Sequence, residues 1–362
     1  AFPDAVDRFL QTYLRLWDGI SNRTAILDLL EYAPIHDDGL FQHYFLPLEN
    51  AMLDNTMESK GSLLRYYAAL IRRYGSILRS NASVNSAIDL ATIIGRAELI
   101  SLTLLECPVV PNLEESNINQ SFSSSVVQFY VQLAELYLHA PTNSLIRLNT
   151  PPPESVYILA FTPVLSNISL MSAVIANYKS SFEQSLATTT SHGSSRRPYP
   201  DAVVTNLNGY VLDICNLLWR NRGLNDDEPN ALGCLVRKEV TKLLTEYIQG
   251  VGEDLAKKGK NGGIYRLRLA SIFSLSHHAA LCGMSAMCFR NLESNEGKDG
   301  MEVSARLTWP VTQKALNALN KAGGIKVDWQ EYRLKMLEWL DEHGSGGIGR
   351  LMRNSMMTLR QG

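Results

Sequence analysis

Three polar side chains interrupt an otherwise apolar stretch, residues 207–224, which reads LNGYVLDICNLLWRNRGL. The apolar residues recur at helical spacing, so we expect a buried helix here. Asp213 and Asn216 are three residues apart and Arg220 follows four later, so these side chains share one face. Burying a charge or an amide is costly unless the group is paired. We predict that this ladder bonds internally and fixes a neighbouring loop; a partner-binding face and a catalytic role are the alternatives.

Two histidines and two cysteines form the best candidate for a metal site. His278 and Cys282 are four residues apart, a spacing at which one helix can supply two ligands. Cys288 lies six residues beyond Cys282 on a different face, and no carboxylate is nearby. We therefore interpret His277 and His278 as residues near a helix N-terminus and the cysteines as small packed hydrophobes. This interpretation predicts no bound metal.

Two basic clusters could contact a phosphate backbone or an acidic partner. The first lies on one expected helix, with tyrosines between its members Arg65, Arg72, Arg73 and Arg79. The second has no acidic residue among its members Lys257, Lys258, Lys260, Arg266 and Arg268. Basic residues with interleaved aromatic rings can bind nucleic acid. The alternative is a solvated face with the tyrosines in the core. It is favoured for the first cluster, and a contact with DNA or an acidic partner is more plausible for the second.

Sequence signatures of several enzyme classes are absent. The chain contains no GxGxxG after a strand, no GxxxxGK[ST], no HExxH and no GxSxG. Cys107 precedes Pro108 and has no activating group beside it in the sequence. We therefore predict a protein that is not an enzyme, with no catalytic residues and no cofactor.

The composition favours a folded nuclear or cytosolic protein. Hydrophobic residues make up 45% of the 362 residues and charged residues 19%, which suffices for a large core. The formal net charge of −2 argues against tight non-specific DNA binding by the whole surface. The five cysteines include no CxxC pair, as expected of reduced thiols. There is neither a signal peptide nor an apolar run of about 18 residues, so we expect no membrane association. The missing initial Met suggests a fragment of a longer chain.

Helical periodicity dominates the whole chain, and almost no alternating strand pattern occurs. We expect about fifteen helices, in pairs about 35 to 45 residues apart, which is the spacing of HEAT-like repeats. The predicted fold is therefore all-α, an irregular HEAT-like helical repeat stack (α-solenoid) with long surfaces for partners. Helical repeats are expected over 1–186 and 201–362, the second set packing on the first. The segments expected to lack helix include the polar run 112–125 and a flexible linker at 187–200, whereas 264–273 is expected to be helical.

Several strings, in the same order, resemble the C-terminal part of the CENP-I family of inner kinetochore proteins. The early part contributes ILDLLEYAP (26–34), FQHYFLPLE (41–49), LLRYY (63–67) and LIRR (70–73). The late part contributes NGYVLDICNLLW (208–219), NALGC (230–234), SIFSLS (271–276), PVTQKAL (310–316) and WQEYRL (329–334). The specificity comes from the order and number of the strings. The region between about 110 and 200 carries little of the resemblance.

The resemblance implies a scaffold subunit of the constitutive centromere-associated network, located in the nucleus at the centromere and kinetochore. Its implied partners are the CENP-H and CENP-K coiled coil, CENP-M where present, and CENP-T and CENP-W. Such a subunit links centromeric chromatin to the outer kinetochore in chromosome segregation. Three other hypotheses stay open: a different helical-repeat adaptor, direct binding of centromeric DNA through the second basic cluster, and an enzyme with a metal held by His278 and Cys282.

Overall fold

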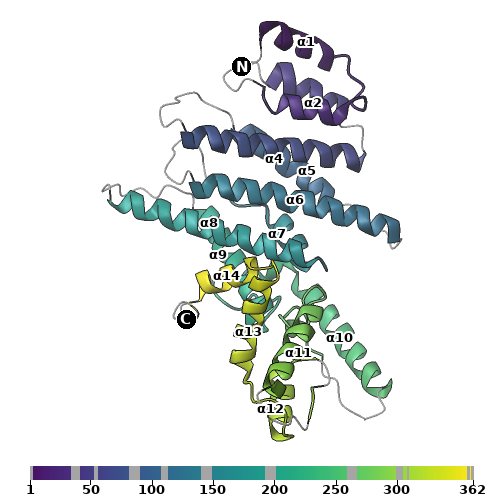
Figure 1. The fold of residues 1–362 in the computed structure, drawn as a ribbon, viewed down its shortest axis with the longest axis vertical. Helices are drawn as coiled ribbons and strands as arrows, with labels where there is room; N and C mark the ends of the chain where they lie inside the picture. Colours follow the sequence, from purple (N-terminus) through teal and green to yellow (C-terminus); the bar gives the residue numbers. More distant parts are fainter. Residues whose placement is uncertain are drawn as a thin grey trace. The chain divides into compact units, whose positions relative to one another are not determined.

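The computed structural model describes residues 3–33, 41–52, 56–80, 90–106, 113–139, 149–191, 201–258, 267–298, 305–307, 310–356 and 359. Fourteen α-helices occupy most of these residues, and no strand is assigned within them. The predicted all-α class is therefore confirmed (Figure 1). None of the described helices is both long and apolar enough to span a membrane.

The chain divides into two compact units. The first comprises Ala1–Ser155 and Asn177–Tyr199, and the second comprises Val156–Ala176 and Pro200–Gly362. The expected linker at 187–200 ends where the second unit resumes, but 156–176 belongs to the second unit rather than to the first.

The first unit is built on layered helices with a core rich in tyrosine. Its helices are α1 (Asp4–Leu14), α2 (Arg23–Leu30), α3 (Leu46–Met52), α4 (Met57–Ser80), α5 (Leu90–Leu105), α6 (Leu113–His139) and the second half of α8 (Leu165–Ser191). A π-helical turn, η1 (Phe41–Phe45), leads directly into α3. Two long helices, α4 and α6, lie side by side, and α5 packs against both (Figure 1). Six tyrosine side chains are fully buried here: Tyr44, Tyr67, Tyr74, Tyr130, Tyr137 and Tyr178.

The second unit contains the remaining helices and several short turns. They are α7 (Pro153–Phe161), the first half of α8, α9 (Asp201–Cys215), the π-helical turn η2 (Asn216–Arg220), the 3-10 turns η3 (Gly233–Leu235) and η4 (Leu269–Ser271), α10 (Lys238–Lys258), α11 (Cys282–Lys298), α12 (Gln313–Lys321), α13 (Trp329–Glu342) and α14 (Gly347–Ser355). Around α12, a core cluster is formed by Phe289, Val311, Leu316, Leu319, Ile325, Val327 and Tyr332.

Local signals fix several helix starts in the second unit. Thr312 accepts a hydrogen bond from the Ala315 amide (3.1 Å) and caps α12, and Asp328 caps α13 through the Glu331 amide (2.8 Å). At the start of α14, Gly347 lies so close to α8 that a Cβ atom there would come within 1.9 Å of the Ser169 carbonyl oxygen. Only glycine permits this approach, which brings the Gly347 amide to 3.2 Å from the Ser169 hydroxyl.

Two expected non-helical segments turn out to be helical. Residues 113–125, predicted as a polar loop, form the first half of α6, where Phe122 packs against Gly61 of α4. Residues 187–191, assigned to the linker, continue α8, while 192–200 lie outside the described residues. Both segments adjoin a helix that is already formed. Extending an existing helix costs less than starting a new one, because each added hydrogen bond requires only one more residue to be fixed.

The predicted helix over 264–273 is wrong for its described part. Residues 267–273 form η4 and turns because their backbone bonds to another segment. The Gly223 amide donates to the Ala270 carbonyl (3.0 Å), and the Leu275 amide donates to the Leu218 carbonyl (3.1 Å). These bonds join 267–275 to the residues around η2 and use groups that an α-helix would need for itself.

Candidate functional site

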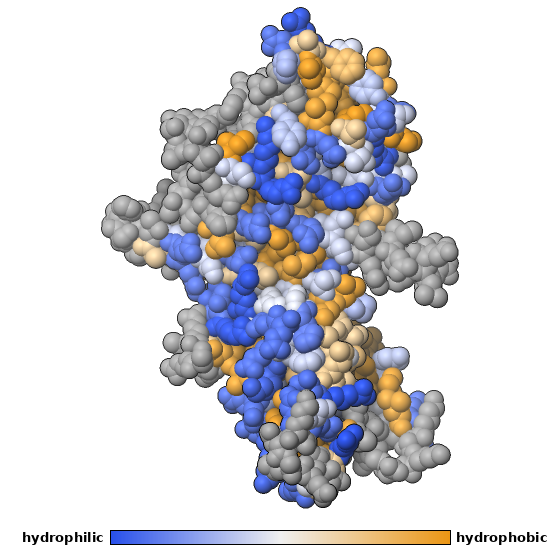
Figure 2. Space-filling model, viewed as in Figure 1, coloured by the Kyte–Doolittle hydropathy of each residue, from blue (hydrophilic) through white to orange (hydrophobic). Residues whose placement is uncertain are grey.

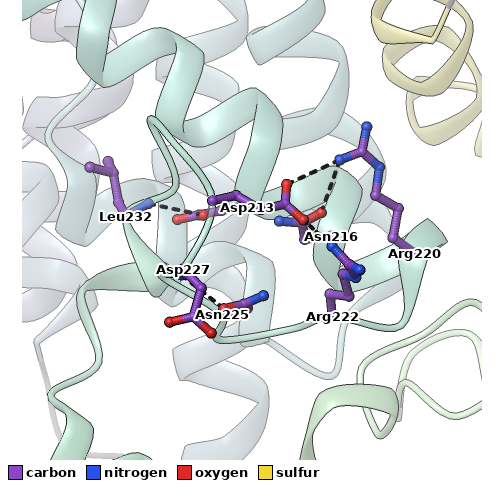
Figure 3. Close-up of polar contacts among 8 residues, drawn as sticks. Asp213, Asn216, Arg220, Arg222, Asn225, Asp227 and Leu232 are labelled. Carbon is purple, nitrogen blue, oxygen red and sulfur yellow. Dashed lines mark hydrogen bonds and ion pairs between the residues drawn. The ribbon is translucent and has the colours of Figure 1, made fainter.

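Asp213 lies at the centre of a buried polar network in the second unit. Its side chain is only 2% exposed. The carboxylate accepts hydrogen bonds from the Tyr157 hydroxyl (2.7 Å), the Leu232 amide (3.1 Å) and the Cys234 amide (2.9 Å). Figure 3 shows Asp213 pointing from its helix towards the loop that carries Leu232. Burial raises the pKa of Asp213, and these three hydrogen bonds act in the opposite direction.

The loop held by Asp213, residues 221–237, has an unusual backbone, and we call it the Asp213 loop. Three consecutive residues, Gly233, Cys234 and Leu235, have φ between +56° and +58°. A side chain in this left-handed region costs about 1–2 kcal/mol per residue. Asn221, Leu224 and Asn230 of the same loop also have positive φ. The loop therefore depends on the hydrogen bonds from its amides to the Asp213 carboxylate.

The outer part of the polar ladder forms ion pairs at the surface. Glu228 accepts from Arg222 and lies 3.3 Å from Arg220, whose guanidinium also approaches the Asn216 side-chain oxygen at 3.4 Å (Figure 3). The hydrogen bond from Arg222 is the main cause of the lowered pKa of Glu228. Asp213 and Arg220 thus bond to different parts of one loop. In this arrangement the Asp213 carboxylate is already occupied by donors.

The two histidines serve the packing of the turn before α11. His278 is 1% exposed, and its Nδ1 accepts from the Ala280 amide (3.1 Å). Its Nε2 therefore carries the proton and donates to the Ala160 carbonyl (3.1 Å). His277 Nδ1 lies 3.1 Å from the Ser274 hydroxyl. Burial lowers the pKa of both imidazoles, so the neutral forms are favoured.

The cysteines make separate contacts. The Cys282 thiol donates to the Ala279 carbonyl (3.4 Å), and Cys288 is buried, where burial raises the pKa of its thiol to about 12. Cys215, Cys234, Cys282 and Cys288 are all free of disulfides. Within the described ranges, no three His, Cys, Asp or Glu side chains come together as a potential metal site.

The first basic cluster, on α4, is split between the interior and the surface. Tyr66, Tyr67 and Tyr74 are buried, so their rings are unavailable for stacking on nucleotide bases. Arg73 is also engaged internally, because it donates to the carbonyls of Glu31 and Ala33 and lies over the Tyr32 ring. Arg65 and Arg72 remain exposed, and the side chain of Arg79 lies outside the described residues. The interleaved tyrosines belong to the core of this unit.

The second basic cluster is described only at its ends. Lys257 is exposed and lies 3.5 Å from Asp254, and Arg268 is exposed just before η4. The side chain of Lys258 and the residues Lys260 and Arg266 lie outside the described part. The prediction of a DNA or acidic-partner contact at this cluster therefore stays a prediction.

Among the helices that the structure describes, α10 has the least covered apolar residues. Its principal packing contact is the short turn η4, and Gly252 is its single buried residue among those described. Leu243 is 65% exposed and Tyr247 is 68% exposed. With them we define the α10 stripe: Val240, Leu243, Leu244, Tyr247, Val251 and Leu255, of which only Val251 is half-buried. In Figure 1 α10 runs along one side of its unit, and Figure 2 shows apolar surface in that region.

An exposed stripe at helical spacing is the pattern of a helix that lies against another apolar surface. The spacing itself is visible in the sequence. What the sequence lacks is a signal for exposure, because a stripe of this kind is also what a core helix shows.

Sequence reasoning also missed two acidic residues that the first unit buries. Glu49 of α3 is 4% exposed, accepts from the Tyr67 hydroxyl and forms an ion pair with Arg96 of α5. Glu98 of α5 is partly buried, and desolvation raises its pKa to about 7. No motif links these residues, since their partners lie on other helices; Glu49 joins three helices of the unit.

The second unit also encloses a small apolar cavity, lined by α7, α8 and α9 and by Leu217 and Leu218 of η2. It offers no charged side chain that could orient a substrate. Comparisons by sequence do not add a family: no protein-family model matches the chain, and no curated protein matches it.

Proposed function

We propose that this chain is a non-enzymatic scaffold subunit of the inner kinetochore that acts in the nucleus at the centromere. It would bind the CENP-H and CENP-K coiled coil and help to link centromeric chromatin to the outer kinetochore. Support comes from the ordered strings that resemble the CENP-I family and from the all-α fold. A scaffold of stacked helices needs surfaces on which other helices can lie.

The observation that carries this proposal is the α10 stripe. A helix that is apolar along one face usually buries that face, because burial contributes about 25 cal/mol per Å² of apolar surface. α10 leaves Leu243 and Tyr247 about two-thirds exposed over a helix of 21 residues. A helix laid along this stripe would cover it, and an amphipathic helix of a coiled coil has the required complementary face.

Co-purification with the CENP-H and CENP-K pair, followed by size exclusion at moderate salt, tests the proposal. We expect a stoichiometric complex with the wild-type chain. The double variant Leu243→Asp, Tyr247→Asp should lose the partner, because a buried carboxylate without a counter-charge is costly. Two single variants compare the position of one added charge on α10. Tyr247→Asp places the charge in the stripe and should also lose the partner. Gln249→Asp places it at an exposed position two residues away and is the control.

The outcomes separate clearly. Loss of the complex with both stripe variants and retention with Gln249→Asp supports the proposal. A folded, helical wild-type chain that does not bind the pair contradicts it. A complex that survives both stripe variants would retain the kinetochore assignment and remove α10 as its binding surface.

CENP-M, CENP-T and CENP-W are further proposed partners, on the resemblance alone. The described geometry gives no reason to prefer a DNA-binding function, since the α4 tyrosines are buried and Lys257 is paired with Asp254. Binding of a duplex that weakens steeply with salt would nevertheless revive that alternative.

A further inference from the structure

Acidic residues follow the α10 stripe at every seventh position. Glu239, Glu246 and Glu253 are all exposed, and none forms an ion pair within the described part of the chain. Glu239 and Glu246 directly precede the stripe residues Val240 and Tyr247, and Glu253 precedes Asp254. In heptad terms, Val240 and Tyr247 occupy a, Leu243 occupies d, and the glutamates occupy g.

The glutamates lie on the open side of the stripe. On its other side, Thr241 and Thr245 are half-buried and Gly252 is buried, which places the body of the second unit there. A partner helix that covers the stripe must therefore pass beside the glutamate row. Side chains at g positions pair with e or g residues of the facing helix and thereby select the partner.

Gly250 occupies the next d position of this heptad pattern, seven residues after Leu243. A Cβ atom there would meet nothing within 4 Å. No neighbouring atom fills this exposed position, so a side chain of a facing helix can approach the α10 backbone closely here.

We propose that α10 binds an amphipathic partner helix whose apolar stripe is bordered by Lys or Arg residues facing Glu239, Glu246 and Glu253. This inference rests on the proposed function and specifies the chemistry of the partner. A second copy of α10 fits poorly: antiparallel pairing would oppose the glutamate rows, and parallel pairing would place them against Leu244 and Val251 of the other copy.

Two synthetic coiled-coil peptides serve as probes. They share apolar a and d residues and differ only at e and g, which are Lys in one peptide and Glu in the other. The wild-type chain should bind the Lys peptide at least about tenfold more tightly at 0.1 M salt, and the preference should shrink at 0.5 M salt. The double variant Glu246→Lys, Glu253→Lys should reverse the preference.

A matched control changes the same charge elsewhere in the second unit. Asp227→Lys with Glu342→Lys alters two exposed acidic residues outside α10, and this variant should keep the preference for the Lys peptide. Equal binding of both peptides, binding of neither, or an unchanged preference in the α10 variant would overturn the inference. The peptide experiment tests only the charge preference of α10. The kinetochore proposal is tested independently by co-purification with the CENP-H and CENP-K pair.

Discussion

α4 and α10 have similar sequence patterns and opposite surroundings. α4 has 24 residues and α10 has 21, and both place apolar residues on one face among charged residues. On α4 the apolar face is covered by α5 and α6, so Leu70 is 1% exposed. On α10, Leu243 is 65% exposed, because among the described elements the short turn η4 is the principal packing contact of that helix.

The difference shows that amphipathicity predicts a helix without predicting what covers it. A covered face contributes to folding, whereas an uncovered face can contribute to binding. The stability of the chain should therefore respond differently to the same type of substitution on the two helices, and the following predictions test this contrast.

The largest expected effect is on folding. Leu70→Ala should lower the free energy of unfolding by about 2–5 kcal/mol, because it removes buried methyl groups and leaves a cavity. Leu243→Ala should change it by less than about 0.5 kcal/mol, because the side chain is already in water. Chemical denaturation of both variants measures the difference. Equal losses would mean that α10 is covered in the isolated chain.

The Asp213 loop leads into α10, so this loop fixes the start of the helix, whose own apolar face is not packed. Asp213→Ala should lower the free energy of unfolding by about 3 kcal/mol, because the Tyr157 hydroxyl and the amides of Leu232 and Cys234 lose their acceptor. Asp227→Ala, at an exposed position of the same loop, is the matched control and should be close to neutral. Similar denaturation midpoints for the two variants would argue against the Asp213 network as the support of the loop.

Covering a helix can also bury a charge, as Glu98 on α5 shows. Its pKa is about 7 in the folded chain, against 4.5 for an ordinary glutamate, so the fold favours the protonated form. Its contribution to stability is therefore present below pH 4.5 and is lost as the pH rises towards 7. Glu98→Gln should raise the unfolding free energy at pH 8 by on the order of 2 kcal/mol and much less at pH 5.

Thermal denaturation of the wild type and of Glu98→Gln between pH 5 and pH 8 measures this difference. His277 and His278 act in the other direction, since the fold favours their neutral forms and loses stability below about pH 6.5. Both chains contain these histidines, so the comparison cancels their effect. A stability difference between wild type and Glu98→Gln that does not change with pH would contradict the raised pKa of Glu98.

The smallest expected effect concerns two helical glycines. Gly250→Ala on α10 should raise the free energy of unfolding by about 0.5–1 kcal/mol, because alanine favours the helix and its Cβ meets nothing within 4 Å. Gly75→Ala on α4 should gain less or lose stability, since its Cβ would lie 3.2 Å from Leu136. Urea denaturation measures the stability of both variants. A larger gain in stability for Gly75→Ala than for Gly250→Ala would contradict the view that α4 is covered and α10 is open.

Local patterns were sufficient for much of the fold. Helical periodicity indicates the all-α class and the helix that carries the first basic cluster, which is α4. The same reasoning failed at 113–125 and at 267–273, where packing against α4 and backbone bonds to the residues around η2 decide the conformation. Such contacts join residues far apart in the sequence, and the local pattern of a single sequence carries no signal of them.

The candidate site shows the same division. The spacing of Asp213, Asn216 and Arg220 indicated a loop-fixing ladder, but Tyr157 is 56 residues from Asp213 and could not be foreseen as its partner. Leu224, Cys234 and Leu235 have positive φ values, and because none of them is a glycine, the sequence gives no signal of this backbone conformation. The exposure of the α10 stripe depends on which surfaces the remaining helices leave free.

Hydrogen–deuterium exchange of the chain, alone and with the CENP-H and CENP-K pair, tests the central claim most directly. A helix with little packing opens locally at low cost, so α10 amides should exchange quickly in the free chain and α4 amides slowly. The account predicts that the pair slows exchange in α10 and leaves α4 unchanged. A bound pair that leaves α10 exchange unchanged would contradict the claim that α10 is the partner-binding surface.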